Sequence, residues 1–162
     1  MKIGIFDSGM GGLSVLHRAL RMIPEADFLY YADEEHVPYG EKTREQVRGY
    51  IDEIIAFMIK KQVDAIVIAC NTATSVATKE YRSQFPLPIV GMEPAVKKAV
   101  EEYADRPGRI LVAATPITIK GDKLHHLVDR VDKRDMVDLV ALPKLVRFAE
   151  QEIFDQDQIV PY

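Results

Sequence analysis

The chain has 162 residues, enough for one ordinary domain or for one domain and part of another. Its composition, 48% hydrophobic and 28% charged, is that of a soluble globular protein with a real core. The net charge of −4 gives no reason to expect a nucleic-acid partner. No apolar run approaches the ~20 residues that span a bilayer, so no membrane partner is expected either.

The chain contains a single cysteine, Cys70, so an internal disulfide is excluded and a reducing cytoplasm is the expected location. An acid at Asp7 comes far too early for a signal peptide.

Short apolar runs alternate with helical periodicity along the chain. Strands are predicted over 3–6, 28–32, 65–69, 88–91 and 110–114, and helices over 11–23, 44–61, 72–82 and 94–103. The helix over 44–61 has the clearest pattern, because Thr43 and Gln46 form a capping box ahead of one apolar stripe. The stripe consists of Val47, Tyr50, Ile51, Ile54, Ile55 and Met58. Near-continuous apolar strands separated by helices predict an α/β fold, with a parallel, flavodoxin-like sheet covered by helices on both faces.

A weak internal sequence similarity suggests two related units. IVIACNTAT (66–74) and ILVAATPIT (110–118) are both apolar strands that end in small and hydroxyl residues. We therefore expect a first α/β domain over residues 1–95 and part of a second, pseudo-symmetric α/β unit over 96–162.

Reactive groups follow three of the predicted strands. Asp7, Asp33 and Cys70 each come directly after a strand or within a residue of it. Because parallel sheets bind ligands at the carboxyl ends of their strands, these groups are candidates for a common site.

Cys70 ends the run AIVIAC and is followed by a polar turn. A free cysteine is commonly an inert, buried, small hydrophobe. Its place at a strand end favours a functional thiol instead, and a helix beginning near Thr72 would lower its pKa.

FDSGMGGLS (6–14) is an acid followed by a glycine-rich turn into a helix. Such a turn can present backbone N–H groups to an anion, or it can be a tight connection in which Ser8 merely caps the helix. VPYGEKT (37–43) is a turn whose phenol and N–H groups could serve a carboxylate ligand. The acidic stretch 33–36 and the pair His125 and His126 are interpreted as solvated rather than as metal ligands.

Taken together, DSGMGG (7–12), PYGEKT (38–43) and ACNTAT (69–74) resemble the glutamate racemases of the cofactor-independent aspartate/glutamate racemase family. The similarity continues through VGMEPAVKKAV (90–100), AATPIT (113–118) and PKLVRFAE (143–150), so it covers nearly the whole chain.

The resemblance implies an isomerase that interconverts L- and D-glutamate by two-base proton transfer, without pyridoxal phosphate, another cofactor or a metal. In this family one cysteine thiolate removes the α-proton and a second thiol returns one on the opposite face. Cys70 matches the cysteine that acts on the D-enantiomer, Asp7 the carboxylate that assists it, and Glu150 the glutamate that assists the opposite side. The positions that match substrate-binding residues are Asp7, Ser8, Pro38, Tyr39, Gly40, Cys70, Asn71, Thr72, Thr115 and Thr118. The resemblance implies glutamate as the small-molecule partner, and a homodimer is compatible with the family. The implied role is to supply D-glutamate in the cytoplasm for peptidoglycan, and hence for cell-wall biogenesis and cell shape.

The sequence departs from the family at several places. Gly121 and Leu124 stand where a serine and a tyrosine are usual, and the family's second cysteine, in a Gly-Cys-Thr-His segment beyond residue 150, has no counterpart here. We therefore expect a truncated chain that is inactive alone. Two alternatives are a degenerate, non-catalytic module that still binds glutamate and a magnesium-dependent phosphoryl-transfer enzyme built on Asp7.

Overall fold

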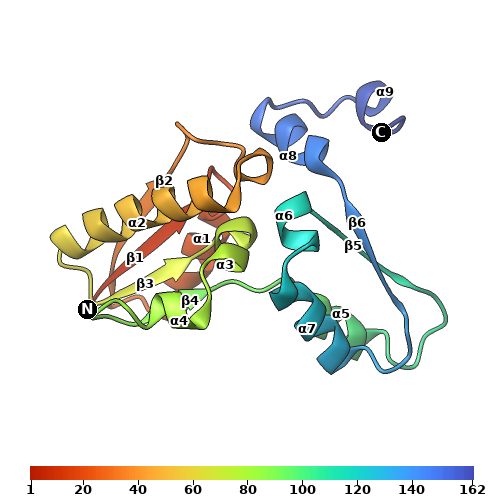
Figure 1. The fold of residues 1–162 in the computed structure, drawn as a ribbon, viewed down its shortest axis with the longest axis horizontal. Coiled ribbons are helices and arrows are strands. Elements are labelled where there is room, and N and C mark those ends of the chain that lie inside the picture. The colour runs from red at the N-terminus through yellow and green to blue at the C-terminus, as the bar shows by residue number, and fades with distance from the viewer. The chain divides into compact units, whose positions relative to one another are not determined.

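The computed structural model describes all residues from 1 to 162. The chain forms two compact units, Met1–Met92 and Glu93–Tyr162 (Figure 1). The division falls in the segment that connects β4 to α5.

The first unit is built on a parallel sheet, as the sequence predicts. Its strands are β1 (Lys2–Asp7), β2 (Asp27–Ala32), β3 (Ala65–Ile68) and β4 (Ile89–Gly91), in the order β2-β1-β3-β4. The register pairs Asp7 with Ala32 and Phe6 with Ile68, so the carboxyl ends of the three longest strands lie at one edge.

Helices cover both faces of this sheet (Figure 1). The chain passes from β1 outward to β2 and then back across β1 to β3. Because such crossovers are right-handed, the two moves place α1 (Leu13–Met22) and α2 (Arg44–Lys60) on opposite faces. Helix α1 has no fully buried residue, whereas α2 contributes much of the core.

Helix α2 begins as the sequence predicts. The Thr43 N–H donates to Gln46 Oε1 at 2.9 Å and the Gln46 N–H donates to Thr43 Oγ1 at 3.2 Å, which completes the capping box. Five of the six residues of the predicted apolar stripe are buried, and the sixth, Tyr50, is half-buried. Of the buried strand residues, Phe6, Ile66 and Ile68 share the face of Gly4, beside which Met58 of α2 lies. Ile3 and Ile5 are buried on the opposite face of the sheet.

The helix predicted over 72–82 is two shorter helices, α3 (Asn71–Val76) and α4 (Lys79–Arg82), so the prediction of one helix is wrong. Thr78 causes the break: its side chain accepts a hydrogen bond from the Tyr81 N–H at 3.2 Å and begins a new helix. Threonine competes with the backbone for such bonds and therefore favours caps over helix interiors. The turn Pro38–Glu41, which precedes α2, contains one short 3₁₀ helix, η1 (Tyr39–Glu41).

The second unit holds a parallel pair, β5 (Ile110–Ala114) and β6 (Val137–Ala141). Helix α5 (Val96–Glu102) precedes β5, helices α6 (Pro116–Ile119) and α7 (Asp122–Val131) connect the strands, and α8 (Pro143–Glu150) and α9 (Gln156–Ile159) follow. Its core is centred on Val96, Leu124 and Leu127.

Strand β6 was not predicted from the sequence, because a charged residue interrupts its apolar run. Asp138 lies in the middle of the strand and binds Arg109 through both carboxylate oxygens, at 2.5 and 2.8 Å. None of the helices in either unit is both long and apolar enough to cross a membrane.

Candidate active site

The candidate site lies at the carboxyl edge of the first sheet, where three strands deliver their reactive groups. Asp7 is the last residue of β1, Asp33 follows β2, and Cys70 comes two residues after β3. Backbone bonds hold these ends in line: the Ala69 N–H donates to the Phe6 carbonyl at 2.8 Å, and the Asp33 N–H donates to the Asp7 carbonyl at 3.0 Å.

Cys70 is the N-cap residue of α3. Its Sγ accepts a hydrogen bond from the Ala73 N–H at 3.4 Å and lies 3.4 Å from Ser8 Oγ. The residue is 7% exposed, so the sulfur is screened from bulk water yet reaches the edge where β1 and β3 end.

The start of helix α3 lowers the pKa of the Cys70 thiol, as expected, but the net shift of that pKa is upward. Burial raises that pKa most, and the charge of Asp7 raises it further, while hydrogen bonds from Ser8 and Ala73 lower it by less. Helix α3 has only six residues, so its dipole is small. Near neutral pH the thiol is therefore protonated, and its thiolate, once formed, is a stronger base than an ordinary one.

Asp7 is buried and held by the glycine-rich turn. Its Oδ2 accepts hydrogen bonds from the Gly9 N–H at 3.3 Å and the Gly12 N–H at 3.0 Å. These two N–H groups donate to the protein's own carboxylate, so of the two readings of the turn this geometry favours the tight connection. Gly12 is required by close packing, because a Cβ there would lie 2.7 Å from the Asp7 Cβ and 2.9 Å from the Tyr30 hydroxyl.

Asp33 differs from the solvated acid that the sequence suggested. Glu34 and Glu35 are exposed, but Asp33 is only 4% exposed and contacts His36 and Tyr39. No third histidine, cysteine or acid joins these residues in a group that could hold a metal ion.

The remaining predicted residues of the first unit lie on η1 and α3. Tyr39 is 2% exposed and belongs to η1, which packs against α3; Pro38 and Gly40 flank it. Asn71 is exposed at the first position of α3, and Thr72 is buried beside it.

The other predicted residues lie in the second unit. Thr115 caps α6, and its Oγ1 lies 3.1 Å from the Oγ1 of Thr118; both are buried. Glu150 is the exposed last residue of α8. Leu124, at a position where the sequence departs from the family, is a core residue.

His125 and His126 are exposed, and His125 Nε2 lies 2.8 Å from the Ile119 carbonyl.

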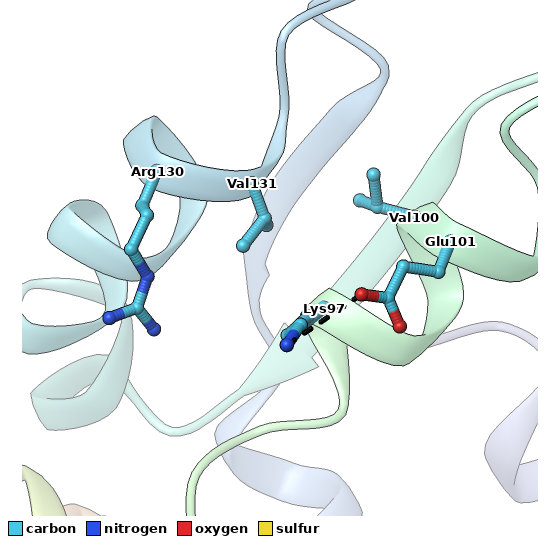
Figure 2. A pocket seen from close by; sticks show the side chains of 5 residues that line it. All are labelled: Lys97, Val100, Glu101, Arg130 and Val131. Carbon is cyan, nitrogen blue, oxygen red and sulfur yellow. Dashed lines mark ion pairs between the residues drawn. The ribbon is translucent and has the colours of Figure 1, made fainter.

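A hollow of about 360 Å³ lies elsewhere in the second unit, between α5 and α7 (Figure 2). Lys97, Val100, Glu101, Arg130 and Val131 line it. None of the predicted site residues is among them, so the hollow is not the candidate active site.

One contributor was underestimated from the sequence. The sequence predicts that Asp33 lies at a strand end in a solvated loop, but in the structure its side chain contacts His36 and Tyr39, three and six residues away. The spacing Asp-x-x-His-x-x-Tyr is the signal that could have shown it.

The chain is therefore an α/β protein with a buried thiol and a buried carboxylate at the carboxyl ends of two neighbouring parallel strands, β3 and β1. The family follows from sequence comparison: the chain belongs to the Asp/Glu/Hydantoin racemase family, which matches residues 8–158.

Curated relatives in this family are longer than the chain. It is 55% identical over 162 residues to a glutamate racemase of Lachnospira eligens and 48% identical over 162 residues to glutamate racemase 2 of Bacillus subtilis. All of this chain is covered in both alignments, and it spans 61% of the length of each relative.

Solved structures show the same fold. A glutamate racemase from Campylobacter jejuni matches with a TM-score of 0.86 at 33% identity, covering 99% of this chain and 64% of that one. The Escherichia coli glutamate racemase, solved with L-glutamate and the activator UDP-MurNAc-ala, matches with a TM-score of 0.83 at 30% identity, covering 93% of this chain and 56% of that one.

Proposed function

We propose that this chain carries the D-glutamate half of a glutamate racemase, in which Cys70 is the base and Asp7 assists it. The observation that carries the proposal is the position of Cys70 Sγ. It lies at the carboxyl edge of the sheet, 3.4 Å from Ser8 Oγ, in a chain 55% identical to a glutamate racemase.

In the proposed step, the Cys70 thiolate removes the α-proton of D-glutamate. The C–H bond breaks, an S–H bond forms, and the electron pair moves into the substrate carboxylate as an enediolate. The chemical difficulty is the weak acidity of an amino-acid α-proton. The raised pKa of the Cys70 thiol supports the assignment, because a stronger thiolate base reduces that mismatch.

The residues of the first unit that would bind the substrate are Ser8, Pro38, Tyr39, Gly40, Asn71 and Thr72. In the second unit, taken by itself, Thr115 and Thr118 are the proposed substrate-binding residues. Backbone N–H groups beside the substrate carboxylate would stabilise the enediolate. Glu150 would assist proton transfer on the opposite face.

Inversion also needs an acid on that opposite face, since a group that removes a proton stays on its own side. These 162 residues contain no second thiol. The proposal for this chain is therefore removal and return of a proton on one face, which exchanges the α-hydrogen of D-glutamate without inverting the carbon.

The test is to incubate the purified chain with D-glutamate in heavy water. Proton NMR would follow loss of the α-proton signal, and chiral chromatography would follow the appearance of L-glutamate. Exchange without inversion supports the proposal. Binding of D-glutamate without exchange would instead support a non-catalytic binding module, and inversion would show that a second acid is present.

The wider role belongs to the same proposal. As part of a racemase the chain would supply D-glutamate for peptidoglycan in the cytoplasm, and hence for cell-wall growth and cell shape. A homodimer is the assembly that we propose, and analytical ultracentrifugation of the purified chain tests it.

A further inference from the structure

Asp33 is a buried carboxylate to which the proposed reaction assigns no role. It is 4% exposed and directly follows β2, and its N–H donates to the carbonyl of Asp7 at 3.0 Å. The residue is therefore fixed to the end of β1, beside the proposed assisting carboxylate. A buried charge is costly unless it is paired and hydrogen-bonded, so its partners are informative.

The two oxygens of Asp33 bind side chains from the segment that follows. The Tyr39 hydroxyl donates to Oδ2 at 2.5 Å, and His36 Nδ1 lies 2.8 Å from Oδ1. The His36 ring stacks on Tyr50 of α2 with ring centroids 3.8 Å apart. Asp33 thus links the end of β2, the turn and helix α2.

Two backbone hydrogen bonds close the turn. The Glu41 N–H donates to the Pro38 carbonyl at 3.3 Å, and the Lys42 N–H donates to the Tyr39 carbonyl at 3.2 Å. The second distance lies at the long end of the usual range for such bonds and the first lies just beyond it. The hydrogen bond from the Tyr39 hydroxyl to the Asp33 carboxylate is of a stronger class.

We propose that Asp33 is a positioning residue, which binds the Tyr39 hydroxyl and thereby holds the turn Pro38–Glu41 against α3 in the shape that receives glutamate. This inference rests on the proposed function, because it takes the turn as part of the glutamate site. In this inference Asp33 acts through Tyr39 and does not itself contact the substrate.

Two physical arguments support this role. Burial, and then the hydrogen bond to Asp33, raise the pKa of the Tyr39 hydroxyl, so the phenol remains a donor throughout the neutral range. Anchoring the turn before the substrate arrives also removes an ordering cost that binding would otherwise have to meet.

The chain offers a matched control for this hydrogen bond. The Tyr81 hydroxyl donates to Asp52 Oδ1 at 2.5 Å, and Tyr81 is 5% exposed, but this pair joins α4 to α2. Tyr39→Phe and Tyr81→Phe therefore each remove a tyrosine–carboxylate bond of the same length, the first buried and the second partly buried, and leave both rings in place. Only Tyr39→Phe should affect the turn.

Two measurements on the purified chain test the proposal. Amide hydrogen exchange of Glu41 and Lys42 reports the order of the turn, and calorimetric titration with D-glutamate reports binding. Tyr39→Phe should speed exchange of both amides and weaken D-glutamate binding by about tenfold or more, because a hydrogen bond to a charged group is lost. Tyr81→Phe should leave both quantities within about twofold of the wild-type chain.

A variant pair separates the carboxylate from the phenol. Asp33→Asn retains an oxygen that can accept from Tyr39, so its binding loss should be smaller than that of Asp33→Ala. If Asp33→Ala does not fold, Tyr39→Phe alone decides the question.

Unchanged amide exchange in Tyr39→Phe would overturn the proposal, as would faster exchange with unchanged glutamate binding. A wild-type chain that neither binds D-glutamate nor exchanges its α-proton is a different result. It would overturn the proposed function, and with it the substrate part of this inference, while the amide exchange would still show whether Asp33 holds the turn.

Discussion

Cys70 Sγ lies 3.4 Å from the Oγ of Ser8, the residue that follows Asp7 at the end of β1. This contact joins two strand ends across the sheet. Its hydrogen bond lowers the pKa of the Cys70 thiol, but burial and the charge of Asp7 raise that pKa by more. The Cys70 thiol thus ionises at a higher pH than an ordinary thiol, and its thiolate is correspondingly a stronger base.

The first prediction concerns the pH at which Cys70 ionises. Because the thiol pKa is raised in the folded chain, the iodoacetamide alkylation rate should reach its midpoint at a higher pH in the native chain than in urea. Every adduct reports on Cys70, since it is the only cysteine. The pH of the midpoint is compared rather than the rate, because burial also slows access. A native midpoint at or below the unfolded one would contradict the pKa direction.

The same shift predicts a pH-dependent contribution to stability. A thiol whose pKa is raised by folding stabilises the fold fully below its unfolded pKa, and this contribution is lost as the pH rises towards the folded pKa. The free energy of unfolding of the wild-type chain should therefore fall relative to Cys70→Ser above the ordinary thiol range. Urea titrations at several alkaline pH values measure the difference. The raised pKa of Tyr81 affects both proteins and cancels, whereas the charge of Cys70 contributes to the raised pKa of Tyr39, so that contribution is part of the measured difference.

The third prediction concerns a variant that lacks the proposed base. Cys70→Ala should lower the rate of α-proton exchange of D-glutamate by on the order of 10²–10⁴-fold or more, because a whole proton-transfer group is lost. The far-UV circular dichroism spectrum should change little, since alanine fits the space left by the thiol, and glutamate affinity should fall by less than the exchange rate. Exchange at the wild-type rate in this variant would eliminate Cys70 as the base.

Much of the fold was predictable because local and tertiary signals agree. The capping box of Thr43 and Gln46 and the apolar stripe of α2 specify both the start and the buried face of that helix. The parallel sheet followed from apolar runs that alternate with helical segments. Where a side chain competed with the backbone, as Thr78 does, the prediction of a continuous helix was wrong.

The chemical environment of the site was less predictable, because it depends on contacts between distant residues. The sequence placed Cys70 at a strand end, but the direction of its pKa shift depends on the depth of burial and on the charge of Asp7. It also placed glycines beside Asp7 without showing that two of their N–H groups bind its carboxylate. The positions of Asp7 and Cys70 at strand ends thus predict that they lie near one another, whereas the protonation behaviour of the thiol depends on its burial in the folded chain.

The fourth prediction concerns the glycine-rich turn. Gly12→Ala should lower the free energy of unfolding by about 1–3 kcal/mol, because the new Cβ would overlap Asp7 and Tyr30 in a packed region. Gly11→Ala is the matched control, since a Cβ there would meet only Asp7 Oδ2, at an ordinary 3.5 Å. Urea titrations of both variants measure the effect. Equal losses would show that the packing around Gly12 is not what requires a glycine.

The last prediction separates two effects of Asp7 on Cys70. The charge of Asp7 raises the pKa of the thiol, so Asp7→Asn should lower that pKa and speed alkylation at a fixed, mildly alkaline pH. The same variant should exchange the α-proton of D-glutamate more slowly, because the thiolate becomes a weaker base and loses the group that assists it. The asparagine carbonyl can still accept from the Gly9 and Gly12 N–H groups, which favours retention of the turn. Faster alkylation with slower exchange is thus the expected pair of results, and glutamate affinity should fall by less than the exchange rate. A variant whose affinity falls while its exchange rate at saturating glutamate is unchanged would make Asp7 a binding group and remove it from the proton transfer.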